Sequence, residues 1–484
     1  MNLKHALNRA ALYGLSIALM RGVSLFMLPF VTGQLDQKSV GQLELLSSIA
    51  FFGSVIVGLG LEEALYRFCG LQQNEDKKKR IAGLIYVVSA ATSIVIFLVF
   101  LGVAAHYTHS GGTLLRFSSI ALVLTTIAFE GLIAIPMGWM RMQDRATLYC
   151  TINVLRCIIQ ASLVWLFLRA EFGLNGVLCA GVISVMMCAA ILFFIQLRSS
   201  SLNLDLNEAR AILYYSLPLV GSGLLAFFLN GFDRWFIGTK LSLEELALYG
   251  IAAKFALALA ILIQPLGMWW SPIRFQLLAA QNGEQQLAKF SVLGMFVITG
   301  GLFVVGYSAP YLINALLPSH YHAAVELIPL ALLAIALKEI AEFCSLGTLH
   351  EHSTARQLHI NIIAALLGVL SILALAKILG MRGVLAAVVL TQAARSLLLF
   401  TASQQRLPLP LPMLRISMLL GITTWLVYQH SLNSLSHESI FGSALAFIHD
   451  GFYLALAALF LFIPEATKVY RQQYRLVRAC SHDA

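Results

Sequence analysis

Charged residues are scarce in this chain. Only 11% of its 484 residues are Asp, Glu, Lys or Arg, whereas 59% are hydrophobic, and the mean hydropathy is +0.83. A soluble protein of this length has far more surface than so few charges could cover. The composition therefore excludes a soluble protein and predicts that most of the chain lies in lipid.

Motifs for catalysis or metal binding are missing as well. The sequence has no GxSxG, Walker or zincin motif, so nothing indicates ATP hydrolysis. None of the seven cysteines forms a CxxC pair, which favours packing in a helix bundle over disulfides or a metal site. In His350-Glu351-His352 the two imidazoles would diverge on a helix, so a solvated turn is the better interpretation. We expect no cofactor and no metal.

The net charge of +9 does not indicate a nucleic-acid partner. Basic residues stand between long apolar stretches and do not gather on one soluble face. Lys4 and Arg9 precede an apolar run that ends at Phe30, an arrangement like that of a signal peptide. That run contains Arg21 and has no small-residue cleavage site, so we predict a retained first membrane helix.

Membrane spans can be located because each needs about 20 mostly apolar residues. The polar connections between such stretches are too short to hold a soluble domain. We therefore predict an all-α polytopic membrane protein with about fourteen transmembrane helices. The predicted spans are 10–33, 42–68, 81–105, 114–139, 146–168, 173–197, 211–238, 246–270, 288–308, 324–347, 357–378, 382–402, 413–430 and 445–464.

Basic residues are unevenly divided between the two sides of these spans. With the N-terminus in the cytoplasm, the cytoplasmic segments hold nineteen Lys and Arg residues and the outer loops hold six. Membrane proteins carry their excess of Lys and Arg on the cytoplasmic side. This asymmetry predicts that both termini are cytoplasmic and that the number of spans is even.

The two halves of the chain share a weak repeat. The segments 32–35 and 40–43 have counterparts about 206 residues later, in 237–241 and 246–249, and Tyr66-Arg67-Phe68 matches Ile273-Arg274-Phe275 at nearly the same offset. Many transporters build two lobes around a central cavity from such repeats. We expect an N-lobe of helices 1–6 (1–200), a C-lobe of helices 7–12 (201–405), and helices 13–14 with a basic cytoplasmic tail (406–484).

Seven basic residues fall inside predicted spans, where a charge costs about 2.5–3.5 kcal/mol. They are Arg21, Arg67, Arg156, Arg234, Lys254, Lys338 and Arg395. Arg67 lies near a helix end and can reach the interface, but the other six are expected to face the bundle interior or a wet cavity. The deep acidic residues are Glu130, Asp233, Glu339 and Glu342. The surplus of two cations favours a negatively charged substrate such as a lipid diphosphate, whose oxygens a guanidinium can bind bidentately.

Two polar stripes have more than one interpretation. Asn153, Arg156 and Gln160 share one face of the fifth span, which would either line a cavity or join two helices. Gln392 and Arg395 form a shorter stripe, for which we favour a contact between helices.

The other deep charges differ in their neighbours. Arg21 has no acidic neighbour in its own helix, so a cavity position is expected. Lys338 and Glu342, four residues apart, can neutralise each other. Asp233 and Arg234 point about 100° apart and cannot serve one spot together. We expect one of them to pair across the bundle and the other to meet solvent.

Three segments of the second half resemble the seventh-to-eighth-helix region of polysaccharide flippases. They are Tyr215-Ser216-Leu217-Pro218-Leu219, Asn230-Gly231-Phe232-Asp233-Arg234 and Leu248-Tyr249-Gly250-Ile251-Ala252-Ala253-Lys254. In the first half, Val40-Gly41 and Gly58-Leu59-Gly60-Leu61 ahead of Arg67 are similar to the same family, which belongs to the multidrug/oligosaccharidyl-lipid/polysaccharide (MOP) exporter superfamily. Ser319-His320-Tyr321 lacks the glycine of the family's usual Gly-x-x-Tyr, a local departure.

The resemblance implies two six-helix lobes around a V-shaped cavity that opens alternately to each side. A cationic cavity would accept the diphosphate and glycan of an undecaprenyl-linked oligosaccharide. By position, Arg21, Asp233, Arg234 and Lys254 would be cavity or gating residues. From their place inside predicted spans we add Arg156 as a cavity residue and Glu130 as a candidate proton or cation site.

The predicted function is thus a bacterial inner-membrane flippase for lipid-linked repeat units of exopolysaccharide, O-antigen or capsule. Lipid-linked oligosaccharide and membrane lipids are the implied partners, with polysaccharide polymerase or assembly proteins as further candidates. One alternative is a drug or cation efflux antiporter of the same superfamily, which should have an anionic cavity and usually twelve helices. Another is a membrane-embedded glycan polymerase, ligase or acyltransferase, for which the outer loops are short, although His449-Asp450 lies beside the last one.

Overall fold

The computed structural model describes residues 18–20, 22–111, 114–201, 205–278, 283–349, 355–434, 446–459 and 461. Every regular element within these ranges is a helix. The helices are α2 (Leu28–Gln34), α3 (Gln37–Gly58), α4 (Leu61–Gly70), α5 (Glu75–His109), α6 (Phe117–Met142), α7 (Ala146–Arg169), α8 (Gly173–Ser199), α9 (Leu206–Asn230), α10 (Phe232–Lys240), α11 (Leu243–Leu278), α12 (Gly283–Leu316), η1 (Ser319–Leu327), α13 (Ile328–Cys344), α14 (Leu346–Leu349), α15 (Ala355–Gln404), α16 (Met413–Ser434) and the terminal helix Ala446–Leu459.

The predicted spans coincide with these helices. In the described part of the chain, nine helices are long and apolar enough to cross a membrane, and the longest of them, Arg356–Gln404, covers two predicted spans. The tenth, thirteenth and fourteenth predicted spans correspond to α13, α16 and Ala446–Leu459. Residues 10–17 of the first predicted span, and Arg21 within it, lie outside the described residues. The all-α, polytopic class is confirmed.

The helix labelled α15 is a hairpin of two antiparallel arms. Gly380 has a left-handed φ of 57°, which breaks the helix where a residue without a side chain is least strained. A Cβ on Gly383 would lie 2.1 Å from the carbonyl oxygen of Leu375, and a Cβ on Gly368 would lie 3.2 Å from Thr391. Residues at similar distances on either side of Gly380 therefore face each other, as two separate spans require.

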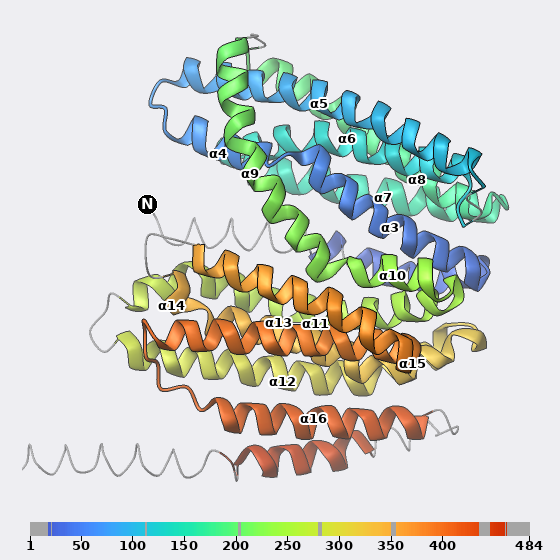
Figure 1. Ribbon diagram of the computed structural model, residues 1–484, viewed down its shortest axis with the longest axis vertical. Helices are drawn as coiled ribbons and strands as arrows, with labels where there is room; N and C mark the ends of the chain where they lie inside the picture. The colour runs from blue at the N-terminus through green and yellow to red at the C-terminus, as the bar shows by residue number, and fades with distance from the viewer. Residues whose placement is uncertain are drawn as a thin grey trace, which may run out of the picture.

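The helices form two lobes, which Figure 1 shows above and below α10. In the N-lobe α6 packs against α3, α5 and α8, and in the C-lobe α13 packs in the same way against α11, α12 and α15. The first helix of the C-lobe breaks near its end, at Gly231 before α10, and in the N-lobe α2 carries a proline, Pro29, in its first turn. This equivalence confirms the pseudo-repeat, whereas the exact lobe boundaries stay a prediction.

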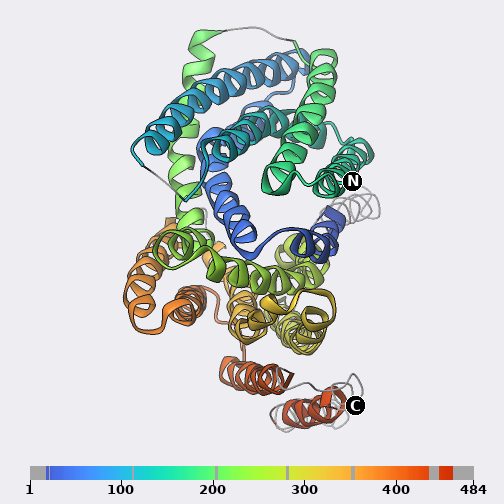
Figure 2. The ribbon, with the colours of Figure 1, turned by 90° about the vertical axis from the view of Figure 1, so that its right-hand side faces the viewer.

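Helix α9 links the two lobes along its length. Its first half lies beside α4 of the N-lobe, where Phe68 and Tyr215 stack edge to face with ring centroids 5.7 Å apart. Its second half contacts α15 of the C-lobe, and Figure 2 shows the helix running between the two groups. The hydroxyl of Ser48 on α3 donates to the carbonyl of Gly231 at 2.9 Å, which ties the break after α9 to the N-lobe.

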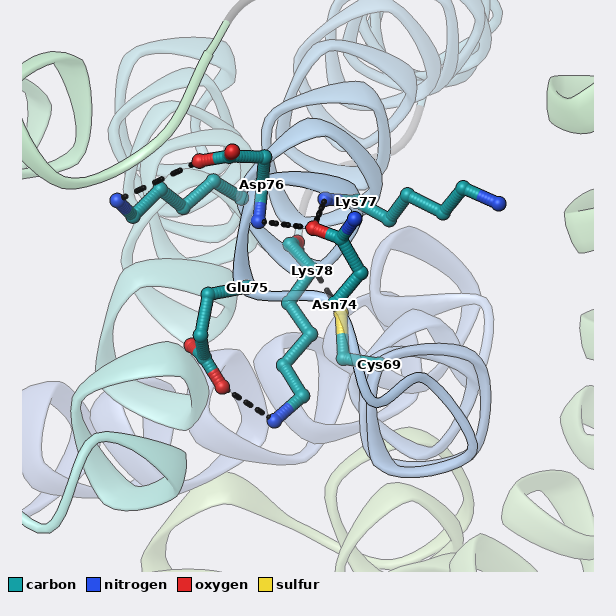
Figure 3. Close-up of polar contacts among 7 residues, drawn as sticks. Cys69, Asn74, Glu75, Asp76, Lys77 and Lys78 are labelled. Carbon is teal, nitrogen blue, oxygen red and sulfur yellow. Dashed lines mark hydrogen bonds and ion pairs between the residues drawn. The ribbon is translucent and has the colours of Figure 1, made fainter.

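The connection between α4 and α5 carries a basic cluster on a capped helix start. The side-chain oxygen of Asn74 accepts hydrogen bonds from the backbone N–H groups of Asp76 and Lys77, at 2.9 and 3.4 Å (Figure 3). Lys78 pairs with Glu75 at 2.6 Å, and Cys69 donates to the Lys78 carbonyl at 3.6 Å. Such a cap supplies partners for the free N–H groups at a helix N-terminus, which is why the helix begins here.

The last two helices pack on the C-lobe through α12. The rings of Tyr307 and His430 stack at 4.2 Å, and the Tyr307 hydroxyl donates to Asp450 on the terminal helix. Val427 of α16 fills the space above Gly306, where a Cβ would come within 2.6 Å of it. These contacts attach the C-terminal pair to the C-lobe, in agreement with the predicted two extra helices.

Candidate functional site: a charged contact between the lobes

The two lobes approach most closely where α3 and α11 begin. A Cβ on Gly41 would lie 1.8 Å from the carbonyl oxygen of Leu243, so only glycine allows this approach. Gln37 donates from its side chain to the Glu244 carbonyl at 3.1 Å, and these residues are 207 positions apart. That separation matches the repeat offset, because residues at equivalent positions meet across the axis that relates two lobes.

Glu44 is the centre of a buried ion cluster at this contact. Its side chain is only 4% exposed and pairs with Lys254 of α11 and, at 3.6 Å, with Arg234 of α10. Gly250 makes room for it, since a Cβ there would lie 2.5 Å from Glu44 Cγ. One N-lobe carboxylate thus pairs with two C-lobe cations. Each of these charges has the partner that a charge inside a membrane protein needs.

Asp233 completes the cluster from the other side of α10. It accepts a hydrogen bond from the Tyr249 hydroxyl, while the adjacent Arg234 points to Glu44. Both nevertheless line one pocket of about 200 Å³, together with Tyr249 and Lys338. Arg234 is thus the member of this pair that bonds across the bundle, whereas Asp233 bonds within the C-lobe, and the expected contact of one of them with solvent stays a prediction. Glu44, Asp233, Arg234 and Lys254 carry balanced charge.

Glu44 was not among the site residues predicted from the sequence, although its position inside a span indicates a functional residue. The residue lies inside the predicted span 42–68, where a carboxylate is as costly as a cation. When Glu44 is counted among the acidic residues inside spans, the surplus of deep cations falls from two to one. Arg234 and Lys254 are consequently held by Glu44 in this conformation.

A second predicted pair forms within the N-lobe. Both terminal nitrogens of Arg156 on α7 bind the Glu130 carboxylate on α6, with one of the two distances at 3.4 Å. The Arg156 side chain is 15% exposed, whereas that of Glu130 is 38% exposed. The polar face of α7 therefore joins two helices, and its carboxylate partner borders a more open space.

The remaining deep cations lie together in the C-lobe. Lys338 of α13 donates to the side-chain oxygen of Asn230 at 3.1 Å, and Arg395 of α15 donates to that of Asn361 at 3.0 Å. Glu342, the predicted partner of Lys338, lies 3.9 Å from Arg395. The predicted contact of Arg395 between helices is present.

A further buried residue of the C-lobe lies close enough to Asp36 of the N-lobe to respond to its charge. Tyr321 of η1 is fully buried, and burial together with the charge of Asp36 raises the pKa of its hydroxyl to about 12. The ring is therefore neutral at any physiological pH. Arg21 and the triplet 350–352 lie outside the described residues, so their predicted roles stay predictions.

Two helical lobes of matching packing meet at one end through buried charges, which is the architecture of a polytopic membrane protein built on an internal repeat. The model of the family described as "Polysaccharide biosynthesis protein" matches residues 7–278, more than half of the chain. The chain belongs to this family. No curated relative matches it.

Solved transporters share the fold. The lipid II flippase MurJ in an inward closed conformation is similar with a TM-score of 0.69 and 13% identity, over 94% of this chain and 100% of MurJ. An inward-facing MATE multidrug transporter of the MOP superfamily gives 0.60 and 14%, over 81% and 94%. A point mutant of the Vibrio cholerae MATE transporter VcmN gives 0.57 and 15%, over 83% and 98%. Family and fold together make this chain a multi-pass membrane transporter and not a membrane-embedded glycan enzyme.

Proposed function

We propose that this transporter moves undecaprenyl-diphosphate-linked oligosaccharide repeat units from the cytoplasmic to the periplasmic leaflet of the bacterial inner membrane. The family match supports a role in polysaccharide biosynthesis, and MurJ is by its name a flippase of a lipid-linked substrate. The observation that carries the proposal is the Glu44–Arg234–Lys254 contact, a buried charged junction between the two lobes.

The junction supplies the switch that alternating access needs. In the predicted orientation α3 and α11 begin at the periplasmic side, so the contact of Gly41 with Leu243 closes the cavity outward. Separating the lobes would release Arg234 and Lys254 from Glu44 and present two cations to a diphosphate. With a phosphate in place of the carboxylate, both cations would still have an anionic partner in the open state.

Arg21, Arg156 and Glu130 have supporting roles in this proposal. Arg21 would bind the substrate in the cavity, as its position in the family implies. Arg156 is paired with Glu130, so protonation of that carboxylate would free the guanidinium for the substrate. Asp233 would respond to separation of the lobes through its hydrogen bond with Tyr249.

Export of drugs or organic cations is the second candidate, because MATE transporters share the fold. A cationic substrate requires an anionic cavity, however. The four ions of the lobe junction balance, and the described residues that line the larger C-lobe pocket include Lys338 and Arg395 but no carboxylate. This distribution favours an anion.

Reconstituted proteoliposomes would test the proposal. Vesicles that hold the protein and a fluorescent undecaprenyl-diphosphate oligosaccharide should equilibrate the lipid between leaflets, as measured by enzymatic access to the glycan from outside. Deletion of the gene should leave lipid-linked repeat units in the cytoplasmic leaflet. Equal leaflet exchange in protein-free vesicles, or export of cationic dyes in place of the lipid, would contradict the proposal.

A further inference from the structure

An apolar pocket of about 400 Å³ lies between the two lobes, beside the charged junction. Its described lining comes from α3, α5 and the start of α6 in the N-lobe and from α10 in the C-lobe. Leu45, the neighbour of Glu44 in α3, forms part of the wall. The volume falls within the range of ligand pockets, about 300–1,000 Å³. Because both lobes contribute to the lining, a ligand bound there would contact both of them.

The described lining of this pocket is apolar. It contains no charged side chain, and its only hydroxyl groups belong to Tyr107 and Thr239. Thr239 donates its hydroxyl to the Trp235 carbonyl at 2.8 Å, and the Leu114 carbonyl accepts from a side chain of α3 at 2.9 Å. Apolar cavities of this kind do not hold water, and an empty one forfeits van der Waals contacts. Hydrocarbon is therefore the ligand class that the pocket fits.

The pocket opens onto a face of α5 that lies in the bilayer. Val103, which lines the pocket, is 63% exposed. It continues a stripe of exposed aliphatic side chains along α5, at Ile94, Val95, Leu98 and Val99. These positions recur at steps of three and four residues, so they share one helix face. A face of this composition inside a membrane span contacts hydrocarbon, so an acyl chain can enter the pocket from the side.

Two cations stand at the rim of the pocket. Arg116 directly follows the lining residue Leu115, Lys240 directly follows Thr239, and both cations are exposed. In the predicted orientation they lie at the outer surface, at the level of the headgroups of the outer leaflet. The phosphate of a phospholipid whose chain occupies the pocket would lie near them. Phospholipid is present at this level in every state, whereas the transported lipid would reach it only after the lobes separate.

We propose that this pocket binds one acyl chain of a phospholipid of the outer leaflet, with Trp235 against the chain. The inference goes beyond the proposed function, since a transporter for any class of substrate could hold such a lipid. The chain would pack on α3 and α5 of one lobe and on α10 of the other. It would thereby add an apolar contact between the lobes beside the Glu44 junction while the outer end is closed.

Tryptophan quenching tests the site, because Trp235 lines the pocket. One full chain would keep Trp235 as its sole tryptophan and a second would keep Trp165, which is 51% exposed on α7 and is not among the lining residues. Both would be purified in detergent, freed of lipid and titrated with phosphatidylethanolamine that carries brominated chains. We expect half-maximal quenching of Trp235 at an about tenfold lower lipid fraction than that of Trp165, because a pocket holds a chain that an open helix surface exchanges for detergent.

Two matched alanines of α5 separate the pocket from the helix surface. Ala104 lines the pocket and is buried, whereas the adjacent Ala105 is exposed and is not among the lining residues. Ala104→Leu fills part of the space, so it should raise the lipid fraction that quenches Trp235 to the value found for Trp165. Ala105→Leu should leave the quenching of Trp235 unchanged.

Equal lipid fractions for Trp235 and Trp165 without either alanine substitution would overturn the proposal, whether or not Ala104→Leu folds. If undecaprenyl diphosphate restored the emission of Trp235 at a lower fraction than unbrominated phospholipid does, the site would belong to the transported lipid and the proposal would fail. Quenching of Trp235 that weakens as the protein is concentrated would show that a second copy of the chain covers the pocket, and would contradict the proposal too.

Discussion

Glu44 carries more of the contact between the lobes than either of its partners. It is the only one of the three ions that is nearly fully buried, and it faces both cations at once. Loss of Lys254 leaves Arg234 at 3.6 Å from the carboxylate, whereas loss of Glu44 leaves two cations facing each other. The three residues therefore differ in what their removal should do.

Glu44→Gln should open the lobe contact more than Lys254→Gln does. Removing one member of a buried ion pair costs about 3 kcal/mol, and Lys254→Gln should cost less because Arg234 remains. Spin labels on the two lobes would report the shift as a longer distance distribution. Glu63→Gln, an exposed acid in the first turn of α4 and far from the lobe contact, is the control. Equal distances in Glu44→Gln and the wild type would contradict this view of the cluster.

Arg156 and Glu130 should behave as a coupled pair. Either Arg156→Gln or Glu130→Gln alone leaves an ion without its partner inside the N-lobe. The double variant should recover about 1 kcal/mol of the summed losses. Thermal unfolding of the four purified proteins measures this coupling, and additive losses would show that the pair is not a unit.

The positions of the helices were easier to predict from the sequence than the bonds between residues of different helices. The span 42–68 and the split between 357–378 and 382–402 followed from hydropathy, since apolar length is set by the bilayer. The bonds of Glu44, Asp233 and Arg156 depend on how helices from different parts of the chain pack, which periodicity along one helix does not encode. The contact of Gln37 with Glu244 matches the repeat offset but was not predicted, whereas the contact of Arg395 between helices was.

Gly41 should be the least replaceable glycine of α3. In Gly41→Ala the new methyl group would lie 1.8 Å from a backbone oxygen of α11, so the helices must separate. Overpacking of this kind costs about 1–3 kcal/mol. Gly33→Ala is the matched control, since a Cβ there meets nothing within 4 Å. Thermal stability and leaflet exchange should fall for Gly41→Ala alone; parallel behaviour of the two variants would argue against a close lobe contact.

At the scale of the whole molecule, two lobes touch at one end and are linked by α9. The same packing pattern in both lobes follows from the repeat, and the non-helical backbone at Gly231 gives the first helix of the C-lobe a point at which to bend. A substrate can pass only if the end held by Glu44, Gly41 and Gln37 opens. Transport and separation of the lobes are therefore inseparable in this account.

Cross-linking across this end tests that claim most directly. In a cysteine-free chain, Gln37→Cys and Glu244→Cys would be joined by a short cleavable thiol cross-linker and reconstituted with lipid-linked oligosaccharide. We predict that leaflet exchange stops when the link is formed and returns when it is cleaved, with single-cysteine variants unaffected by the reagent. Full exchange by the cross-linked protein would contradict the account.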